Sequence, residues 1–280
     1  NSFYQTGLKN LIDKAVMKHT EENQKFNPSI FQKLDEIPFD FARRRMSVIV
    51  KDISGEHTMV CKGAVEEILS ICSYTEIDGK VVSLTDGICS NVKQLSETFN
   101  SEGMRVIAVA YKKDRPINDK KYAVQDENDM ILAGYISFLD PPKPSAATAI
   151  QALQKHGVQV KILTGDNEIV TRKVCKEVGL NISEPVLGYE INSLPDKVLA
   201  KLAEETTVFA KLNPMQKSRI IRVLQENGHT VGYMGDGIND AVALREADVG
   251  ISVDTATDIA KESSDIILLE KSLTILEAGI

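Results

Sequence analysis

The sequence of 280 residues has no long apolar run, no excess of positive charge and no cysteines at metal-binding spacing. No segment approaches the roughly 20 consecutive apolar residues that a helix needs to cross a bilayer. The net charge of −7 argues against nucleic acid as a partner, because no basic stripe is left to neutralise phosphates. The four cysteines, at positions 61, 72, 89 and 175, show no C-x-x-C spacing, so we interpret them as reduced thiols of a cytosolic protein.

The first half of the chain combines a helical pattern with several strand-like runs. Residues 39–52 form one such run, and Asp78-Gly79 between two others predicts a hairpin turn. The charged residues 112–129 predict an exposed loop. Antiparallel strands with segregated helices predict an α+β domain.

From Asp140 onward, strands and helices alternate, which predicts a doubly wound parallel sheet and an α/β fold. Pro141 and Pro142 stop the preceding strand and stiffen the link between the halves. A chain of this length can bury two cores. We therefore expect one domain over residues 1–139 and a second over residues 140–280.

Two short loops in the second half carry the chemistry. Thr164-Gly165-Asp166 follows the apolar run 158–163, and Gly235-Asp236-Gly237-Ile238-Asn239-Asp240 follows the run 230–234. Ligands of open α/β sheets sit at the carboxyl ends of the strands, so both loops should meet at one point, within reach of Lys217. A hydroxyl, glycine amides, a lysine and paired aspartates suit a phosphoryl group with its Mg²⁺. Taken singly, each motif is also typical of a turn, a helix cap or a surface lysine.

These motifs resemble the phosphorylation domain of P-type cation-transporting ATPases, members of the haloacid-dehalogenase superfamily. Asp140-Pro141-Pro142-Lys143 is similar to the family's hinge, and Phe41-Ala42-Arg43 and Lys62-Gly63-Ala64 are similar to its nucleotide-binding domain. The resemblance covers essentially the whole chain, and residues 37–48 and 250–273 look most like magnesium-transporting members. It implies a nucleotide-binding domain over residues 1–139 and a haloacid-dehalogenase-like phosphorylation domain over residues 140–280.

One family motif is missing from the sequence. The nucleophile of the family is the aspartate of Asp-Lys-Thr-Gly-Thr, which occurs nowhere in these 280 residues. In the family it precedes the nucleotide-binding domain, so we expect it before Asn1. The chain would then be a soluble piece, at the cytosolic face, of a larger membrane protein. In superfamily members the strand that carries this aspartate lies in the middle of the parallel sheet, so we expect a gap there.

The resemblance also implies a role for individual residues. ATP is expected in the first domain, with Phe41 stacking on adenine and Lys62 lining the pocket. The residues placed at the nucleotide are Gln5, Phe41, Arg43, Lys62, Gly63, Arg105, Asp140 and Asp166. The residues placed at phosphoryl transfer are Thr164, Gly165, Lys217, Asp236, Asn239 and Asp240, with Asp236 and Asp240 as the Mg²⁺ ligands.

Other functions stay open at this point. A small-molecule phosphatase of the same superfamily would share the second-domain motifs but would lack the domain that carries Phe41 and Lys62. A third possibility is a module that binds nucleotide without turnover, because the nucleophile is missing. If the protein is a pump, its partners are ATP, the membrane and actuator domains, and a cation bound outside this chain. Magnesium is the expected cation, with calcium and protons as the alternatives.

Overall fold

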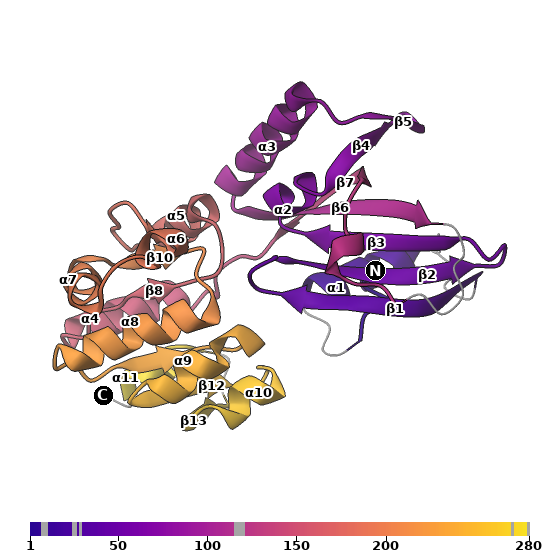
Figure 1. The fold of residues 1–280 in the computed structure, drawn as a ribbon. Helices are drawn as coiled ribbons and strands as arrows, with labels where there is room; N and C mark the ends of the chain where they lie inside the picture. Colours follow the sequence, from indigo (N-terminus) through magenta and orange to yellow (C-terminus); the bar gives the residue numbers. More distant parts are fainter. Residues whose placement is uncertain (7–10, 24–26, 28–29, 115–120, 270–271, 279–280) are drawn as a thin grey trace. The chain divides into compact units, whose positions relative to one another are not determined.

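The computed structural model describes residues 1–280 apart from 7–10, 24–26, 28–29, 115–120, 270–271 and 279–280. The chain divides into two compact units, and each is described by itself (Figure 1). The first comprises Asn1–Asn100 and Met104–Leu139, and the second comprises Ser101–Gly103 and Asp140–Ile280. Within the described ranges, no helix has the length and apolar character needed to cross a membrane.

The first unit is built on a seven-stranded sheet with the order β1-β2-β3-β6-β7-β4-β5. All neighbours are antiparallel except β4 and β7, which are parallel, so the predicted α+β architecture is confirmed. Its elements are α1 (Leu11–Asn23), β1 (Phe31–Asp40), β2 (Arg45–Asp52), β3 (His57–Gly63), α2 (Val65–Leu69), β4 (Cys72–Ile77), β5 (Lys80–Ser83), α3 (Asp86–Ser101), β6 (Met104–Asp114), the 3₁₀ turn η2 (Val124–Asp126) and β7 (Met130–Leu139).

Strand β2 lies inside the sheet and is buried on both faces. Ile49 packs into the main core together with Met59 and Met130, whereas Met46 and Val48 belong to a smaller cluster. A strand that is covered on both sides needs apolar residues in succession, which explains the continuous run Val48-Ile49-Val50. The hairpin predicted at Asp78-Gly79 is confirmed, because both residues have positive φ and β4 pairs with β5 directly across them.

Two expectations for the first unit are wrong. Residues 39–52 are not one run, because a turn separates β1 from β2; Asp40 Oδ1 accepts hydrogen bonds from the Ala42 and Arg43 amides, both at 2.8 Å. Residues 112–129 are not simply an exposed loop. Strand β6 continues to Asp114, and Tyr122 and Glu127 are buried.

The second unit alternates helices with short parallel strands. Its elements are α4 (Ala146–Lys155), β8 (Ile162–Leu163), α5 (Glu168–Glu177), β9 (Val186–Leu187), α6 (Gly188–Ile191), α7 (Asp196–Glu205), β10 (Val208–Ala210), α8 (Pro214–Glu226), β11 (Gly232–Met234), the 3₁₀ turn η3 (Ile238–Asp240), α9 (Ala241–Glu246), β12 (Val249–Val253), α10 (Asp258–Glu262), β13 (Ile266–Leu268) and α11 (Ile275–Ala278).

The parallel strands form two sheets, where the sequence predicts a single one. One sheet has the order β8-β10-β9 and the other β11-β12-β13. Among the described residues, β8 pairs only with β10, and β11 pairs only with β12. The break therefore falls between the two strands that precede the predicted site loops. Both strands are shorter than the runs 158–163 and 230–234.

Helix α8 joins the two halves of the second unit. Its residues Ile220 and Val223 belong to the core beside β10, and Ile221 belongs to the core beside β11 and β12. The sequence sets where this helix begins. Asn213 Oδ1 accepts a hydrogen bond from the Gln216 amide at 2.9 Å, and Gln216 Oε1 accepts one from the Asn213 amide at 2.8 Å. Pro214 occupies the first helical position.

Candidate functional site

A buried ion pair lies at the centre of the predicted phosphoryl site. Lys217, on the first turns of α8, is 7% exposed, and Asp240, at the end of η3, is 8% exposed. Lys217 Nζ donates to Asp240 Oδ1 at 2.8 Å. An ammonium group has three hydrogens, and Lys217 Nζ has no other partner among the described residues. Two donors of a nearly buried cation are thus left for a further acceptor.

Asp240 is held by three donors. Besides Lys217, Tyr233 donates its hydroxyl to Oδ1 at 2.7 Å, and the Gly237 amide donates to Oδ2 at 3.1 Å. Burial alone would raise the pKa of Asp240, but the charge of Lys217 and these hydrogen bonds hold that pKa below its usual range. Asp240 is therefore ionised at neutral pH.

Tyr233 is a member of this group that the sequence analysis missed. It lies on β11 with 9% of its surface exposed. Burial and the neighbouring Asp240 charge raise the pKa of Tyr233, which keeps the phenol neutral and able to donate. Its position two residues before Gly235 is typical of an ordinary buried strand residue, so the sequence carries no signal for the hydroxyl contact.

Gly235 is required by the close approach of its own loop. A Cβ atom at this position would lie 2.4 Å from Asp240 Cβ and 2.6 Å from Asp240 Cγ, closer than atoms can approach. The glycine therefore lets the loop fold back so that Asp240 reaches Lys217. The next residue, Asp236, is exposed, and its carboxylate makes no hydrogen bond or ion pair with the part of the chain that the structure describes. Asn239 is also exposed.

The loop Thr164-Gly165-Asp166 is connected to the start of α8 through the backbone. The Leu212 amide donates to the Thr164 carbonyl at 2.9 Å, and the Lys211 amide donates to the Asp166 carbonyl at 2.7 Å. Thr164 Oγ1 accepts from the Asp166 amide at 3.1 Å, and its hydroxyl hydrogen has no acceptor within the described part of the chain. Gly165 is exposed. The structure thus connects the first predicted loop to the helix that carries Lys217.

The first unit places several predicted nucleotide residues around Lys62, whose side chain is 12% exposed. Lys62, on β3, donates from Nζ to Gln5 Oε1 at 2.7 Å and to Ser2 Oγ at 3.3 Å, and it forms an ion pair with Asp13. The Asp13 side chain is fully buried. Burial would raise the pKa of Asp13, but hydrogen bonds from Lys62, Ser2 and Gln5 and the charge of Lys62 lower it overall. The sequence analysis missed Asp13.

Lys62 and Phe41 belong to segments that pack against each other. Gly63 pairs with Arg45 at the start of β2, and a Cβ atom at Gly63 would lie 2.5 Å from Arg45 Cβ. The turn that carries Phe41 ends at that same Arg45. Phe41 is 38% exposed and makes an edge-to-face contact with Phe39 at 5.2 Å between ring centroids.

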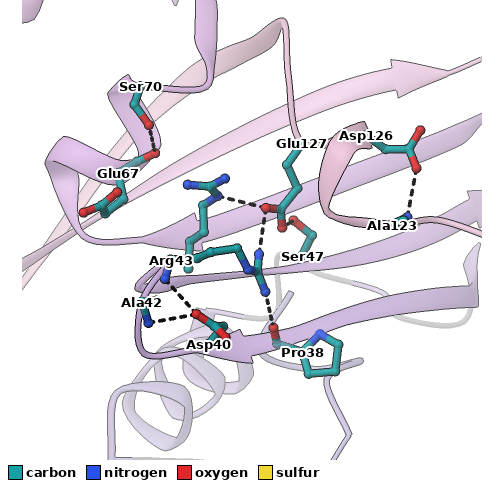
Figure 2. A network of polar contacts seen from close by, with 11 residues as sticks. Pro38, Asp40, Ala42, Arg43, Ser47, Glu67, Ser70, Ala123, Asp126 and Glu127 are labelled. Carbon is teal, nitrogen blue, oxygen red and sulfur yellow. Dashed lines mark hydrogen bonds and ion pairs between the residues drawn. The ribbon is translucent and has the colours of Figure 1, made fainter. Parts of the chain in front are cut away.

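Arg43 makes protein contacts in this structure. Its guanidinium donates at 2.8 Å to Glu127 Oε2 and at 2.8 Å to the Pro38 carbonyl (Figure 2). Arg105 is half-buried on β6, three residues from Ala108, which pairs with Gly63. Asp140 and Asp166 belong to the second unit. Their roles at the nucleotide, like that of Arg105, stay predictions.

No group of three or more His, Cys, Asp or Glu side chains suited to hold a metal ion occurs among the described residues. Asp236 is the carboxylate that is both exposed and uncommitted at the loop, whereas Asp240 is engaged by three donors.

Comparison with known proteins identifies the family to which the chain is related. Residues 1–145 match the family described as P-type ATPase, cytoplasmic domain N. The chain is 55% identical over 281 residues to "Magnesium-transporting ATPase, P-type 1" of Escherichia coli (strain K12), and 54% identical to the protein of that name from Salmonella typhimurium (strain 14028s / SGSC 2262). Each match covers 100% of this chain and 31% of the relative.

A more distant relative transports a different ion according to its name. "Calcium-transporting ATPase lmo0841" of Listeria monocytogenes is 31% identical over 263 residues, which cover 92% of this chain and 30% of that protein. The chain thus spans about a third of the length of the curated relatives that it matches. The chain belongs to the P-type ATPase family, and residues 1–145 correspond to the cytoplasmic N domain of that family.

Proposed function

We propose that this chain is the ATP-binding and phosphoryl-handling part of an ATP-driven cation pump, with magnesium as the transported ion. The first unit binds ATP, and the second holds the phosphoryl group during its transfer to an aspartate. One observation carries the proposal for the second unit. Beside a buried Lys217–Asp240 pair, two donors of Lys217 and the whole carboxylate of Asp236 are uncommitted among the described residues.

Asp236 is the residue best suited to hold the catalytic Mg²⁺. Mg²⁺ prefers carboxylate oxygens and keeps several waters, and the exposed, unpaired Asp236 carboxylate leaves room for both. Asp240 is better suited to fix Lys217 than to bind the ion directly, since both of its oxygens already accept hydrogen bonds. When bound, Mg²⁺ supplies charge neutralisation for the phosphoryl oxygens. Lys217 Nζ, Thr164 Oγ1 and the Gly165 amide would donate to the remaining oxygens.

The break between the two parallel sheets suggests where the acceptor aspartate enters. Strands β8 and β11 each have one described neighbour, and each is followed by one of the two site loops. We infer that a parallel strand from outside residues 1–280, carrying the acceptor aspartate, pairs with both. Its carboxyl end would then lie between the Thr164 and Asp236 loops, where parallel strands present their ligands.

The nucleotide part of the proposal rests on the first unit. The exposed ring of Phe41 is available to stack on the adenine, and Lys62, next to Gly63 in the chain, contacts Gln5. The relation of residues 1–145 to the N domain supports ATP as the ligand, and it counts against a small-molecule phosphatase of the superfamily. The choice of magnesium over calcium rests on the higher identity to the magnesium-transporting relatives, 55% against 31%.

The proposal is tested by Asp236→Asn in a full-length pump that contains this chain. Removing the charged Mg²⁺ ligand should lower the rate of phosphoenzyme formation by about 100-fold or more, because metal neutralisation contributes several kcal/mol. Phosphoenzyme is trapped with labelled ATP in acid. Asp258→Asn, on an exposed aspartate of the same unit, is the matched control and should retain the wild-type rate. A near wild-type rate for Asp236→Asn would refute the assignment of Asp236.

A further inference from the structure

Glu127 is a fully buried carboxylate that the proposed function has not yet used. Its side chain is 0% exposed, although it follows η2 in a charged segment of the chain. A buried carboxylate is costly unless it is paired and hydrogen-bonded. Glu127 meets both conditions. Oε2 accepts from Arg43 Nη1 and from Arg45 Nε, both at 2.8 Å, and Oε1 accepts from Ser47 Oγ at 2.7 Å.

All three donors belong to the turn that carries Phe41 or to the strand directly after it. Arg43 lies in the turn, and Arg45 and Ser47 are the first and third residues of β2. Figure 2 shows Glu127 reaching from its own segment to Arg43 and Ser47. The contacts join residues that are 80 to 84 positions apart in the sequence.

The turn is held from its other side by contacts along β1. The second arm of the Arg43 guanidinium donates to the Pro38 carbonyl at 2.8 Å, and Asp40 Oδ1 accepts from the Ala42 and Arg43 amides. Arg44 completes the turn with φ of +48°, a conformation that side chains rarely adopt, so the turn needs contacts that hold it. Arg43 is the residue common to both sets of contacts. Through it, Glu127 is connected to both ends of the turn.

We propose that Glu127 is a positioning residue for the nucleotide site, which fixes the turn 40–45 and so presents the ring of Phe41 to the adenine. The inference rests on the proposed function for its ligand, and on the contacts of Glu127 for its mechanism. Without the carboxylate, two guanidinium groups that are only 18% and 12% exposed would repel each other across the base of the turn. The turn would open, and the Phe41 ring would lose its fixed position.

The test uses the 280-residue chain and the variant Glu127→Gln, which keeps the shape of the side chain and removes its charge. The first readout is amide hydrogen exchange at Ala42 and Arg43, whose amides hold the turn closed. We expect exchange there to accelerate about tenfold, while the amides of Val48 and Val50 in the middle of β2 keep their protection. Unchanged exchange at Ala42 and Arg43 would overturn the proposal, whether or not the chain binds ATP.

The second readout is a double-mutant cycle with Phe41→Ala, measured as the Kd for ATP. Because Glu127 acts through Phe41, Glu127→Gln should weaken ATP binding about fivefold in the wild-type background and less than about twofold in the Phe41→Ala background. Equal weakening in both backgrounds would show a purely structural or electrostatic role and would contradict the proposal. If wild-type chain shows no ATP binding, the proposed function fails, and the exchange readout decides the positioning role alone.

Two further variants serve as a milder test and as a control. Ser47→Ala removes the contact to Glu127 Oε1 together with a side-chain hydrogen bond to Cys61, and it leaves both arginine contacts of Glu127 in place. It should shift both readouts in the same direction with a smaller size, and it replaces Glu127→Gln if that variant does not fold. Glu76→Gln is the matched control. Glu76 also accepts a hydrogen bond, from Tyr111 at 2.7 Å, but on β4 and away from the turn, so both readouts should stay at wild-type values.

Discussion

Each of the two units has a lysine–aspartate ion pair at its predicted site, with side chains at most 12% exposed. The two lysines differ in how many of their hydrogens have an acceptor among the described residues. Lys62 contacts Asp13, Gln5 and Ser2, so all three of its hydrogens have acceptors. Lys217 contacts Asp240 alone among the described residues. All three hydrogens of Lys62 thus have acceptors within the chain, whereas Lys217 has two hydrogens that could be donated to a ligand.

The two units also differ in the continuity of their sheets. The seven strands of the first unit form one continuous hydrogen-bonded sheet, whereas the parallel strands of the second unit form two sheets. The break lies between the strands that lead to the site loops. A continuous sheet in the unit proposed to bind ATP, and a break beside the loops proposed to hold the phosphoryl group, fit the proposed function.

Exchanging each lysine for methionine should separate the two roles. Lys217→Met in a full-length pump should reduce phosphoenzyme formation by about 100-fold, because the phosphoryl charge loses a nearly buried cation. Lys62→Met should instead destabilise the chain by roughly 3–5 kcal/mol, because it leaves the Asp13 carboxylate buried without its cation. Phosphoenzyme trapping and urea unfolding of the 280-residue chain measure the two effects.

The proposed difference between the two lysines would be contradicted if Lys217→Met destabilised the chain as much as Lys62→Met. Each aspartate keeps two hydrogen-bond donors after loss of its lysine, Tyr233 and Gly237 at Asp240 and Gln5 and Ser2 at Asp13. The Asp240 side chain is 12% exposed and that of Asp13 is 0% exposed, so Lys217→Met should cost less stability than Lys62→Met. Lys197→Met, at an exposed position of α7, is the control and should change neither the rate nor the stability.

Tyr233→Phe is a smaller change at the Lys217–Asp240 pair. It removes the hydroxyl bond to Asp240 and keeps the buried ring, so we expect about 1 kcal/mol less stability. Phosphoenzyme formation should slow about fivefold, because Asp240 then fixes Lys217 less well. Urea unfolding and rapid-quench phosphorylation measure the two values. A wild-type rate in a destabilised variant would limit Tyr233 to a structural role.

The pH dependence of stability should be the smallest effect. The pKa of Asp240 is lowered in the folded chain, so its contribution is complete above the unfolded value of about 4 and is lost as pH falls through the folded value. The stability difference between wild type and Lys217→Met should therefore be constant from pH 7 to 5 and should shrink as pH falls below about 4. Urea unfolding at pH 7, 5 and 3 tests this, and a difference that grows on acidification would contradict it.

Local features of the molecule could be predicted from the sequence, and long-range features could not. The hairpin at Asp78-Gly79 is set by residues that need positive φ. The turn after Asp40 was missed because its four residues are not the usual turn formers; a side-chain cap and a distant carboxylate hold it. Glu127 could not be recognised because its partners are 80 to 84 residues away.

The same distinction between local and long-range features applies to the candidate site. The order of the two loops and Lys217 along the chain was enough to predict that they belong together, and the structure connects them through Leu212 and Asp240. The number of free donors on Lys217 and the hydroxyl of Tyr233 depend on three-dimensional packing. The break in the parallel sheet was expected only through the family resemblance. No property of the strands themselves predicts it.

The proposed function predicts that this chain binds ATP without turning it over, because the acceptor aspartate would come from outside residues 1–280. One preparation tests both parts of this prediction. Calorimetry of the 280-residue chain with ATP should show binding that weakens about tenfold in Phe41→Ala, since stacking on a base contributes about 1–3 kcal/mol. Phosphate release by the same sample should not exceed the level of an Asp236→Asn control. Binding that is lost in Phe41→Ala, with no release, is the predicted result. Steady phosphate release that disappears in Asp236→Asn, or no ATP binding by wild type, would contradict the account.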